Sequence, residues 1–192
     1  IFKINQSPEH FCTYSGHSKS VKDVQFNTDG TQFLSASYDR YVKLWDVETG
    51  KVMSKFTKDK FPLCLKYYPE DDNYFLVGQS DKKIICYDVR DQSVQQLYDY
   101  HNDEVRTITF FDRNRRFVST GLDNHLRVFE WSIPVETKQI KDPSISPIIC
   151  AIAKRDQTAL ITQCMDSVMR CFDMEQGFRF NRKKRFQGHA IT

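Results

Sequence analysis

The fold of this chain is decided by residues 35–46, which read Ser-Ala-Ser-Tyr-Asp-Arg-Tyr-Val-Lys-Leu-Trp-Asp. Residues 119–130 repeat the pattern as Ser-Thr-Gly-Leu-Asp-Asn-His-Leu-Arg-Val-Phe-Glu. In both stretches the fifth residue is an aspartate that follows a histidine by 22 positions, Asp39 after His17 and Asp123 after His101. Both the pattern and the interval recur, so the chain contains an internal repeat.

The period of this repeat predicts the fold. Weaker copies centred on Asp81 and Asp166 place the four aspartates at successive steps of 42, 42 and 43 residues. A period of about 40–45 residues, with Gly-His early and Trp-Asp late, is the signature of the WD repeat, in which each copy forms one four-stranded blade of a β-propeller. We therefore predict an all-β protein, and this fold favours a function in binding over one in chemistry.

Each copy divides into four short segments of alternating apolar residues separated by turn residues, without any long helical period. The strands expected in the first two copies are 21–26, 33–37, 42–47 and 52–56, then 63–68, 75–78, 84–88 and 94–98. Those expected in the last two are 105–111, 117–120, 126–131 and 137–141, then 148–153, 159–162, 168–173 and 178–180, the last extending towards 186.

The copies define the expected domain organisation. We predict blades at residues 16–58, 59–99, 100–142 and 143–187. Phe2 stands before His17 much as Tyr87 stands before His101, so residues 1–15 should end a preceding blade, and Gly188-His189 should open a further one at 188–192. An open stack of sheets leaves unpaired edges, and WD-repeat rings usually contain seven blades. We therefore expect a segment of a larger ring.

The bulk composition excludes several classes of protein. A net charge of +3 over 192 residues does not by itself indicate a nucleic-acid binder. No apolar run approaches the ~18 residues that span a bilayer, so we expect no membrane association. The chain opens with Ile-Phe-Lys-Ile, neither an initiator methionine nor a secretory signal, which predicts an intracellular protein whose natural start lies upstream.

The cysteines indicate packing rather than chemistry. The six cysteines include no Cys-x-x-Cys pair and no histidine at zinc-ligand spacing. Cys86 and Cys171 fall on an apolar position of the third strand in their copies, where a reduced cysteine behaves as a small hydrophobe. We predict no metal, no cofactor and no small-molecule substrate.

One set of residues has the inventory of a catalytic triad. Ser35, His17 and Asp39 supply a hydroxyl, an imidazole and a carboxylate. The alternative is a buried network in which the Trp45 indole binds the serine, the serine binds the histidine, and the histidine binds the aspartate. The set recurs as Ser119, His101 and Asp123, and an enzyme has little use for two identical sites at blade spacing. We therefore expect a structural network and no catalytic residue.

The copies carry this network unequally. The third copy has Phe129 in place of tryptophan and so lacks the indole donor. The second copy has Val77 for the serine, Tyr87 for the tryptophan and no histidine. The fourth copy has Thr162 and Phe172, again without the histidine. The first copy should therefore be held most completely.

Loops on one propeller face are candidates for partner binding. The residue before each turn aspartate should lie on that face, and three of the four are large and apolar or aromatic. With nearby cations, the expected protein-binding residues are Tyr38, Arg40, Lys82, Leu122 and Met165. The alternative is that these side chains pack against neighbouring loops.

Two basic runs are candidates for contact with RNA or phosphate. One run lies in the last strand of the fourth copy and contains Arg179, Arg182, Lys183, Lys184 and Arg185. The other lies in a turn of the third copy and contains Arg113, Arg115 and Arg116. The first run could also serve as a nuclear import signal. Charged outer strands also protect sheet edges, and no base-stacking aromatics are interleaved here. We favour edge protection, with contact to RNA in a large assembly left open.

Beyond the common repeat, the sequence resembles the pre-mRNA-processing factor 17 family. The matching stretches span nearly the whole chain and comprise residues 16–19, 27–35, 38–46, 80–84, 114–119, 127–131, 133–135, 178–179, 183–184 and 188–189. The stretch 130–135, Glu-Trp-Ser-Ile-Pro-Val, is the most distinctive because it lies outside the common repeat. Phe129 departs from the tryptophan usual in that family, and the family's long N-terminal region and final blades fall outside this sequence.

The resemblance implies a nuclear, non-enzymatic scaffold of the spliceosome that acts around the second catalytic step of splicing. Its partners would be spliceosomal proteins and, less directly, small nuclear RNA or pre-mRNA. Two alternatives remain open at this point: a WD-repeat adaptor of another complex, such as a ubiquitin-ligase substrate receptor or a coat subunit, and an enzyme that uses the Ser/His/Asp set.

Overall fold

The alternating apolar pattern produces strands throughout the described part of the chain. The computed structural model describes residues 2–4, 8–10, 12–175 and 178–187. Regular structure within those ranges consists of β-strands, and among them no helix is long and apolar enough to cross a membrane. The predicted all-β WD-repeat fold is confirmed.

Sixteen strands form four antiparallel sheets, each made of four strands consecutive in sequence. The first two sheets contain β3 (Val21–Phe26), β4 (Gln32–Ser37), β5 (Val42–Asp46) and β6 (Val52–Phe56), then β7 (Pro62–Tyr67), β8 (Tyr74–Gln79), β9 (Ile84–Asp88) and β10 (Val94–Tyr98). The other two contain β11 (Val105–Phe111), β12 (Arg116–Gly121), β13 (His125–Glu130) and β14 (Glu136–Lys141), then β15 (Ile148–Ala153), β16 (Ala159–Cys164), β17 (Val168–Asp173) and β18 (Arg179–Gln187). Each expected strand is present, with ends that differ by one or two residues except in β18.

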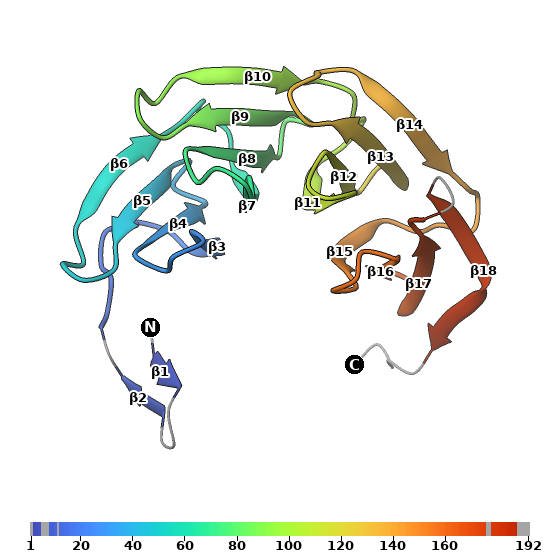
Figure 1. Cartoon of the computed structure of the whole chain (residues 1–192), viewed down its shortest axis with the longest axis horizontal. Coiled ribbons are helices and arrows are strands. Elements are labelled where there is room, and N and C mark those ends of the chain that lie inside the picture. The colour runs from blue at the N-terminus through green and yellow to red at the C-terminus, as the bar shows by residue number, and fades with distance from the viewer. Residues whose placement is uncertain (1, 5–7, 11, 176–177, 188–192) are drawn as a thin grey trace.

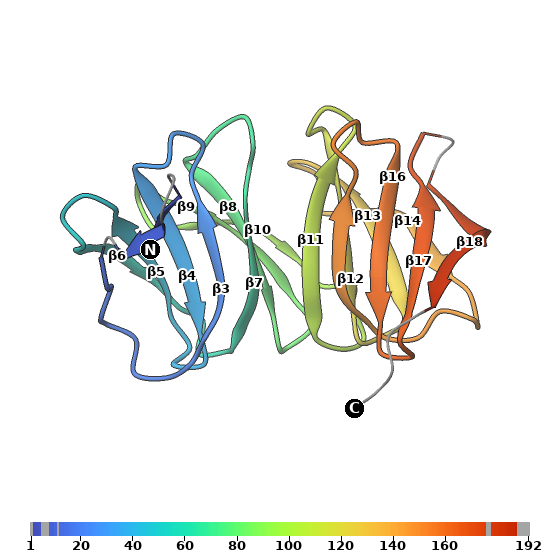
Figure 2. The same cartoon turned by 90° about the horizontal axis from the view of Figure 1, so that it is seen from below.

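The four sheets stand side by side in an arc (Figure 1). The first strand of each sheet lies on the concave side, and the fourth strand lies on the convex side. Viewed from below, β3, β7, β11 and β15 run side by side along the concave wall (Figure 2). This is the arrangement of propeller blades around an axis, and it places the inner strands along a central channel.

The two ends of the chain were expected to belong to neighbouring blades. β1 (Phe2–Ile4) and β2 (Pro8–His10) form an antiparallel hairpin with Phe2 opposite His10, separate from the four sheets. Such a hairpin is compatible with the last two strands of a preceding blade, and that assignment stays a prediction. Residues 188–192, the expected start of a further blade, lie outside the described residues.

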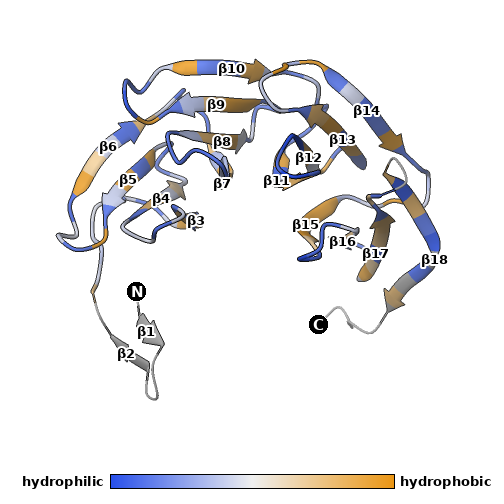
Figure 3. Ribbon diagram, in the orientation of Figure 1, coloured by the Kyte–Doolittle hydropathy of each residue, from blue (hydrophilic) through white to orange (hydrophobic). Residues whose placement is uncertain are grey.

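Three apolar clusters hold neighbouring sheets together. One joins the first two sheets around Leu65 and Phe75, and another joins the second and third around Ile108 and Phe117. The last joins the third and fourth around residues such as Leu160. The apolar colouring of Figure 3 follows the strands, and the turns are mainly polar. Burying one such large side chain contributes about 1.5–3 kcal/mol, so these clusters supply most of the cohesion between sheets.

The aromatic residue of each third strand packs on its own second strand in the first three sheets. Trp45 stacks on Phe33 with ring centroids 5.9 Å apart, and Phe117 and Phe129 stack at 5.2 Å. Tyr87 and Phe75 stack at 5.4 Å. The tryptophan position is therefore an apolar packing position first, which explains why tyrosine and phenylalanine can occupy it.

The six cysteines all lie within the described residues, and no disulfide joins them. Cys86 and Cys171 are buried, as expected of small hydrophobes, and burial raises the pKa of the Cys86 thiol to about 12. Cys150 differs, because it is exposed on β15. Among the described residues, no group of three or more histidine, cysteine or carboxylate side chains is arranged to hold a metal ion.

Candidate functional site

The first sheet brings together the four residues predicted to form a network. The Trp45 indole donates to Ser35 Oγ at 2.7 Å, and Ser35 Oγ lies 2.6 Å from His17 Nε2. His17 Nδ1 lies 2.7 Å from Asp39 Oδ2. The serine hydroxyl has one proton and accepts from the indole, so it donates to Nε2, and His17 donates its Nδ1 proton to the carboxylate. The chain of bonds ties β5, β4, the segment before β3 and the β4–β5 turn together.

The glycine of the Gly-His motif has a steric explanation here. A Cβ atom at Gly16 would stand 2.8 Å from the Trp45 ring, closer than real Cβ contacts come. Any larger residue would push the histidine segment off the tryptophan. Gly16 is thus part of the network because it lets its neighbour His17 reach Ser35.

The third sheet repeats the network without the indole. His101 Nδ1 lies 3.0 Å from Asp123 Oδ2, and His101 Nε2 lies 2.7 Å from Ser119 Oγ. A buried guanidinium adds to it: Arg127 Nη2 is 3.4 Å from Asp123 Oδ2, and its Nη1 donates to Glu136 at 2.6 Å. Arg127 occupies the position of Lys43, whose ammonium group donates to the carbonyl oxygen of Gly16 in the first copy, so the third copy has an ion-pair network in place of that bond.

The electrostatics agree with the geometry. Burial alone would raise the pKa of Asp39, but hydrogen bonds from His17 and from the backbone N–H groups of Tyr41 and Ser18 outweigh it and lower the pKa. The same balance lowers the pKa of Asp123 strongly, with His101 as the main stabilising partner. Both carboxyl groups are ionised at neutral pH and serve as acceptors.

As a nucleophilic site, this arrangement lacks access. Ser35 is 3 % exposed and Ser119 is fully buried. The Ser35 oxygen also accepts from the indole, which occupies a position that an incoming carbonyl group would need. We interpret the set as a means of satisfying buried polar groups.

The fourth sheet uses an arginine that sequence reasoning missed. Arg170, itself buried, donates to both oxygens of Asp166, at 2.9 Å to Oδ1 and 2.5 Å to Oδ2, and to the carbonyl oxygen of Ser144. Ser144 stands 22 positions before Asp166, where the first and third copies have histidine. The guanidinium therefore replaces the imidazole as the group that holds the turn aspartate. The signal was a basic residue four positions after the aspartate, as in Arg127.

The second sheet has no replacement. Ile85 occupies the position of Arg170, and Asp81 Oδ1 is buried without a hydrogen-bond partner. Ser80, the residue before this aspartate, still donates its backbone N–H to the carbonyl of Phe61. The Phe61 backbone N–H in turn donates to Ser80 Oγ at 3.3 Å, so the turn is placed through Ser80 rather than through the unpaired Asp81 oxygen.

The predicted protein-binding residues lie at equivalent turns of different sheets. Tyr38, Leu122 and Met165 each donate a backbone N–H to a carbonyl just before the first strand of their sheet. Met165 is 59 % exposed and Leu122 is partly exposed. Arg40 and Lys82 are exposed and adopt left-handed backbone conformations, with φ of 73° and 77°.

The Tyr38 side chain packs against a neighbouring loop, which was the alternative to partner binding. Its ring packs edge-on against Phe61, with centroids 5.6 Å apart, and Lys22 Nζ lies 5.2 Å from its centroid. The Arg40 guanidinium lies 5.7 Å from the Phe61 centroid. The Tyr38–Phe61 ring pair therefore holds one cation on each ring, Lys22 on Tyr38 and Arg40 on Phe61.

The two basic runs lie in different sheets, and several of their arginines are paired. Arg115 and Arg116 both bind Asp112, at 3.4 and 3.0 Å, and Arg182 binds Asp142 at 2.6 Å. Arg179 and Lys184 are exposed on β18. The side chains of Lys183 and Arg185 lie outside the described residues. Contact with RNA or phosphate through these residues stays a prediction.

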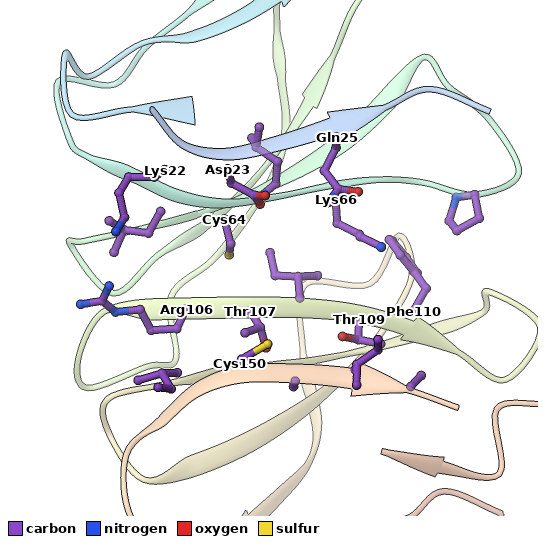
Figure 4. Close-up of a pocket in the computed structure, with 18 of the residues that line it drawn as sticks. Lys22, Asp23, Gln25, Cys64, Lys66, Arg106, Thr107, Thr109, Phe110 and Cys150 are labelled. Carbon is purple, nitrogen blue, oxygen red and sulfur yellow. The ribbon is translucent and has the colours of Figure 1, made fainter. Parts of the chain in front are cut away.

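A cavity of about 580 Å³ lies along the inner strands, lined by residues of β3, β7, β11 and β15. Figure 4 shows the cationic side chains of Lys22 and Arg106 at one end and that of Lys66 towards the other. No sequence pattern predicts this cavity, because its lining is set by how adjacent sheets meet.

Blade-like sheets around a channel, held by a repeated Ser-His-Asp network, define the class of protein: a WD-repeat β-propeller segment. The family described as WD domain, G-beta repeat matches residues 8–46 and 92–130, the two copies with the full Ser-His-Asp set. Over 182 residues the chain is 49 % identical to pre-mRNA-processing factor 17 of Homo sapiens and, equally, of Mus musculus. Over 180 residues it is 33 % identical to pre-mRNA-processing factor 17 of Saccharomyces cerevisiae. The chain belongs to the pre-mRNA-processing factor 17 family, and the predicted resemblance is confirmed.

These matches cover 94 % of this chain for the human and mouse proteins and 92 % for the yeast protein. The chain spans 31 % of the human and mouse proteins and 40 % of the yeast protein. What the whole proteins do therefore bears on this chain only as a proposal.

Proposed function

We propose that the protein is a non-catalytic WD-repeat scaffold of the spliceosome that acts in the nucleus, in pre-mRNA splicing around the second catalytic step. Its membership of the pre-mRNA-processing factor 17 family is the observation that carries this proposal. The burial of Ser35 and Ser119 supports a role without chemistry. A scaffold needs a rigid frame with recognition loops, and a propeller of hydrogen-bonded blades supplies one.

The proposed partners are spliceosomal proteins, bound through the loop face. Its candidate contact residues are Tyr38, Arg40, Lys82, Leu122 and Met165. Small nuclear RNA or pre-mRNA is a further candidate, through the exposed cations of β18 and the β11–β12 turn, Arg179, Arg182, Lys184, Arg115 and Arg116. Because Arg115, Arg116 and Arg182 already have carboxylate partners, we expect their contribution to RNA contact to be weaker than that of Arg179 and Lys184.

Depletion of the protein from nuclear extract tests the function and its timing. Splicing of a labelled pre-mRNA should stop after the first step, so that lariat intermediate and free 5′ exon accumulate without ligated exons. Purified full-length protein should restore the second step. A block before the first step would refute the proposed timing, and unchanged splicing would refute the function.

The serine-nucleophile alternative has a direct chemical test. A fluorophosphonate probe labels an activated serine, so full-length protein should remain unlabelled at Ser35 and Ser119. The unfolded protein serves as the control for unspecific reaction. Labelling at either serine in the folded protein alone would revive the enzyme hypothesis.

A further inference from the structure

The channel wall contains a pattern that neither the network nor the loop face explains. All four inner strands have a β-bulge at the same place, between Val21 and Asp23 in β3 and at the equivalent pairs in β7, β11 and β15. A bulge re-aims the side chain of its extra residue. The four bulge residues all line the cavity, and they alternate between cationic and aliphatic: Lys22, Leu63, Arg106 and Ile149.

A second level of the wall lies three residues further along each strand. These residues also line the cavity, and they are Gln25, Lys66, Thr109 and Ile152. Figure 4 shows Lys66 and Gln25 extending from adjacent strands into the same part of the cavity. The wall thus presents three cations from three consecutive sheets, with polar and aliphatic side chains between them.

The cations at the mouth of the channel are held in place. Lys22 lies over the Tyr38 ring, which packs against Phe61. Arg106 Nη2 binds Glu104 Oε2 at 2.5 Å, and Arg106 Nε is buried without a hydrogen-bond partner. Side chains that are already ordered lose less entropy when they bind an anion.

The single carboxylate among the lining residues is already engaged. Asp23 accepts hydrogen bonds from the backbone N–H groups of Leu65, at 2.7 Å, and Val24, at 2.8 Å. Burial raises the pKa of Asp23 and the nearby Lys66 opposes that shift, but neither Lys22 nor Lys66 forms an ion pair with Asp23 within the described residues. With Glu104 paired to Arg106, two carboxylates stand against the three cations, so the wall retains an excess of positive charge in a concave site, where opposite charge on a ligand is attracted most strongly.

The surroundings favour a peptide over a nucleic acid. Tyr38 and Phe61 meet edge-on, and each has a cation over its ring, so neither offers the open face on which a base would stack. Ile149 and Ile152, 40 % and 66 % exposed, would face a phosphodiester backbone without benefit, whereas they can contact aliphatic side chains of a peptide.

We propose that the inner wall of the channel binds an acidic peptide segment of a partner protein, with carboxylates on Lys22, Arg106 and Lys66 and aliphatic side chains between them. This goes beyond the proposed scaffold function, because it names the chemistry of a bound partner. It can be tested with purified protein outside any splicing reaction, so the failure of one proposal is distinguishable from that of the other.

The test uses full-length protein and a fluorescein-labelled peptide in which glutamates alternate with leucines and serines, followed by fluorescence anisotropy. The same peptide with glutamine in place of glutamate should bind at least about tenfold more weakly, equivalent to about 1.4 kcal/mol. Lys22→Glu and Lys66→Glu should each weaken binding of the acidic peptide by about tenfold, and added salt should weaken it further. Lys22 is exposed and Lys66 is half-buried, and neither forms an ion pair within the described residues, so the fold should survive the change.

The matched control is Lys51→Glu, which reverses an exposed lysine in the β5–β6 turn, on the convex side, and should leave binding unchanged. Equal binding of the glutamate and glutamine peptides, or an equal effect of Lys51→Glu and Lys22→Glu, would overturn the proposal. A single-stranded oligouridine that binds more tightly than the peptide, and is lost with Lys22→Glu, would overturn it in favour of nucleic acid.

Discussion

Asp81 and Asp123 occupy the same position in neighbouring copies. Asp123 has several hydrogen-bond partners, whereas one oxygen of Asp81 has none. Asp123 accepts from His101 at 3.0 Å, from the backbone N–H of Asn102 at 3.1 Å and from Arg127 at 3.4 Å. Asp81 Oδ1 is buried without a partner. Replacing each with alanine removes the same side chain from equivalent positions, so the difference in lost stability measures what the hydrogen-bond partners of Asp123 contribute.

The expected magnitudes follow from what each change leaves behind. Asp123→Ala strands His101 and the backbone N–H groups of Asn102 and His125, and an unsatisfied buried donor costs about 1–3 kcal/mol. Breaking a buried ion pair by removing one partner costs about 3–5 kcal/mol, but Arg127 keeps its bond to Glu136. We expect a loss of about 3 kcal/mol. Asp81→Ala removes an unpaired buried oxygen, so we expect less than about 1 kcal/mol.

Thermal unfolding of full-length protein, followed by circular dichroism, gives the comparison. Since 1 kcal/mol lowers the Tm of a 150–250-residue domain by about 2–4 °C, we expect Asp123→Ala to lower the Tm by about 6–12 °C and Asp81→Ala by less than about 2–4 °C. Equal shifts for the two variants, or a larger shift for Asp81→Ala, would refute the reasoning that partners at this position determine stability.

Four further outcomes are expected from the same thermal assay. Trp45→Phe removes one hydrogen bond to Ser35 and keeps the ring stack, so it should cost about 1 kcal/mol. Arg170→Ala should destabilise strongly, and Arg170→Lys should restore only part, because an ammonium group cannot bind both Asp166 oxygens in a fork. Gly121→Ala should prevent stable folding, since its Cβ would lie 2.3 Å from the carbonyl oxygen of Glu104. Arg170 lowers the pKa of Asp166 to about 2, so the stability from this pair should be complete above about pH 4 and disappear as the pH falls towards about 2.

Each of these outcomes has a contradicting result. A Trp45→Phe variant as damaged as Asp123→Ala would mean that the indole bond, not the ring stack, holds the first sheet. Full rescue by Arg170→Lys would mean that charge alone matters there. A normally folded Gly121→Ala protein would contradict the close approach, and identical acid profiles for wild type and Arg170→Ala would exclude the Asp166 pair as their cause.

The fold could be predicted from the sequence because two independent periodicities agree. The two-residue alternation along segments such as 105–111 predicts strands, and the 42-residue step between aspartates predicts blades. The first network was predictable because His17, Ser35 and Asp39 recur at fixed spacing. Because each copy folds in the same way, residues at the same spacing occupy equivalent positions in the sheets, and spacing alone predicts that they meet.

Other features depended on contacts between copies that differ in sequence. Arg170 reads as an ordinary strand residue until Ser144 is found in the histidine position beside it. Tyr38 reads as an exposed docking residue, but its partner Phe61 comes from the neighbouring sheet. The bulges that direct Lys22 and Arg106 into the channel are register shifts, and register between strands is not written in the side-chain pattern of one strand.

The central claim, that this family member works as a scaffold inside the spliceosome, is tested most directly by affinity purification. Tagged full-length protein would be recovered from nuclear extract, and its co-purifying RNA and proteins would be identified by sequencing and mass spectrometry. The account predicts spliceosomal small nuclear RNAs together with splicing intermediates and spliceosomal proteins. Recovery of ubiquitin-ligase or coat subunits without those RNAs would contradict it.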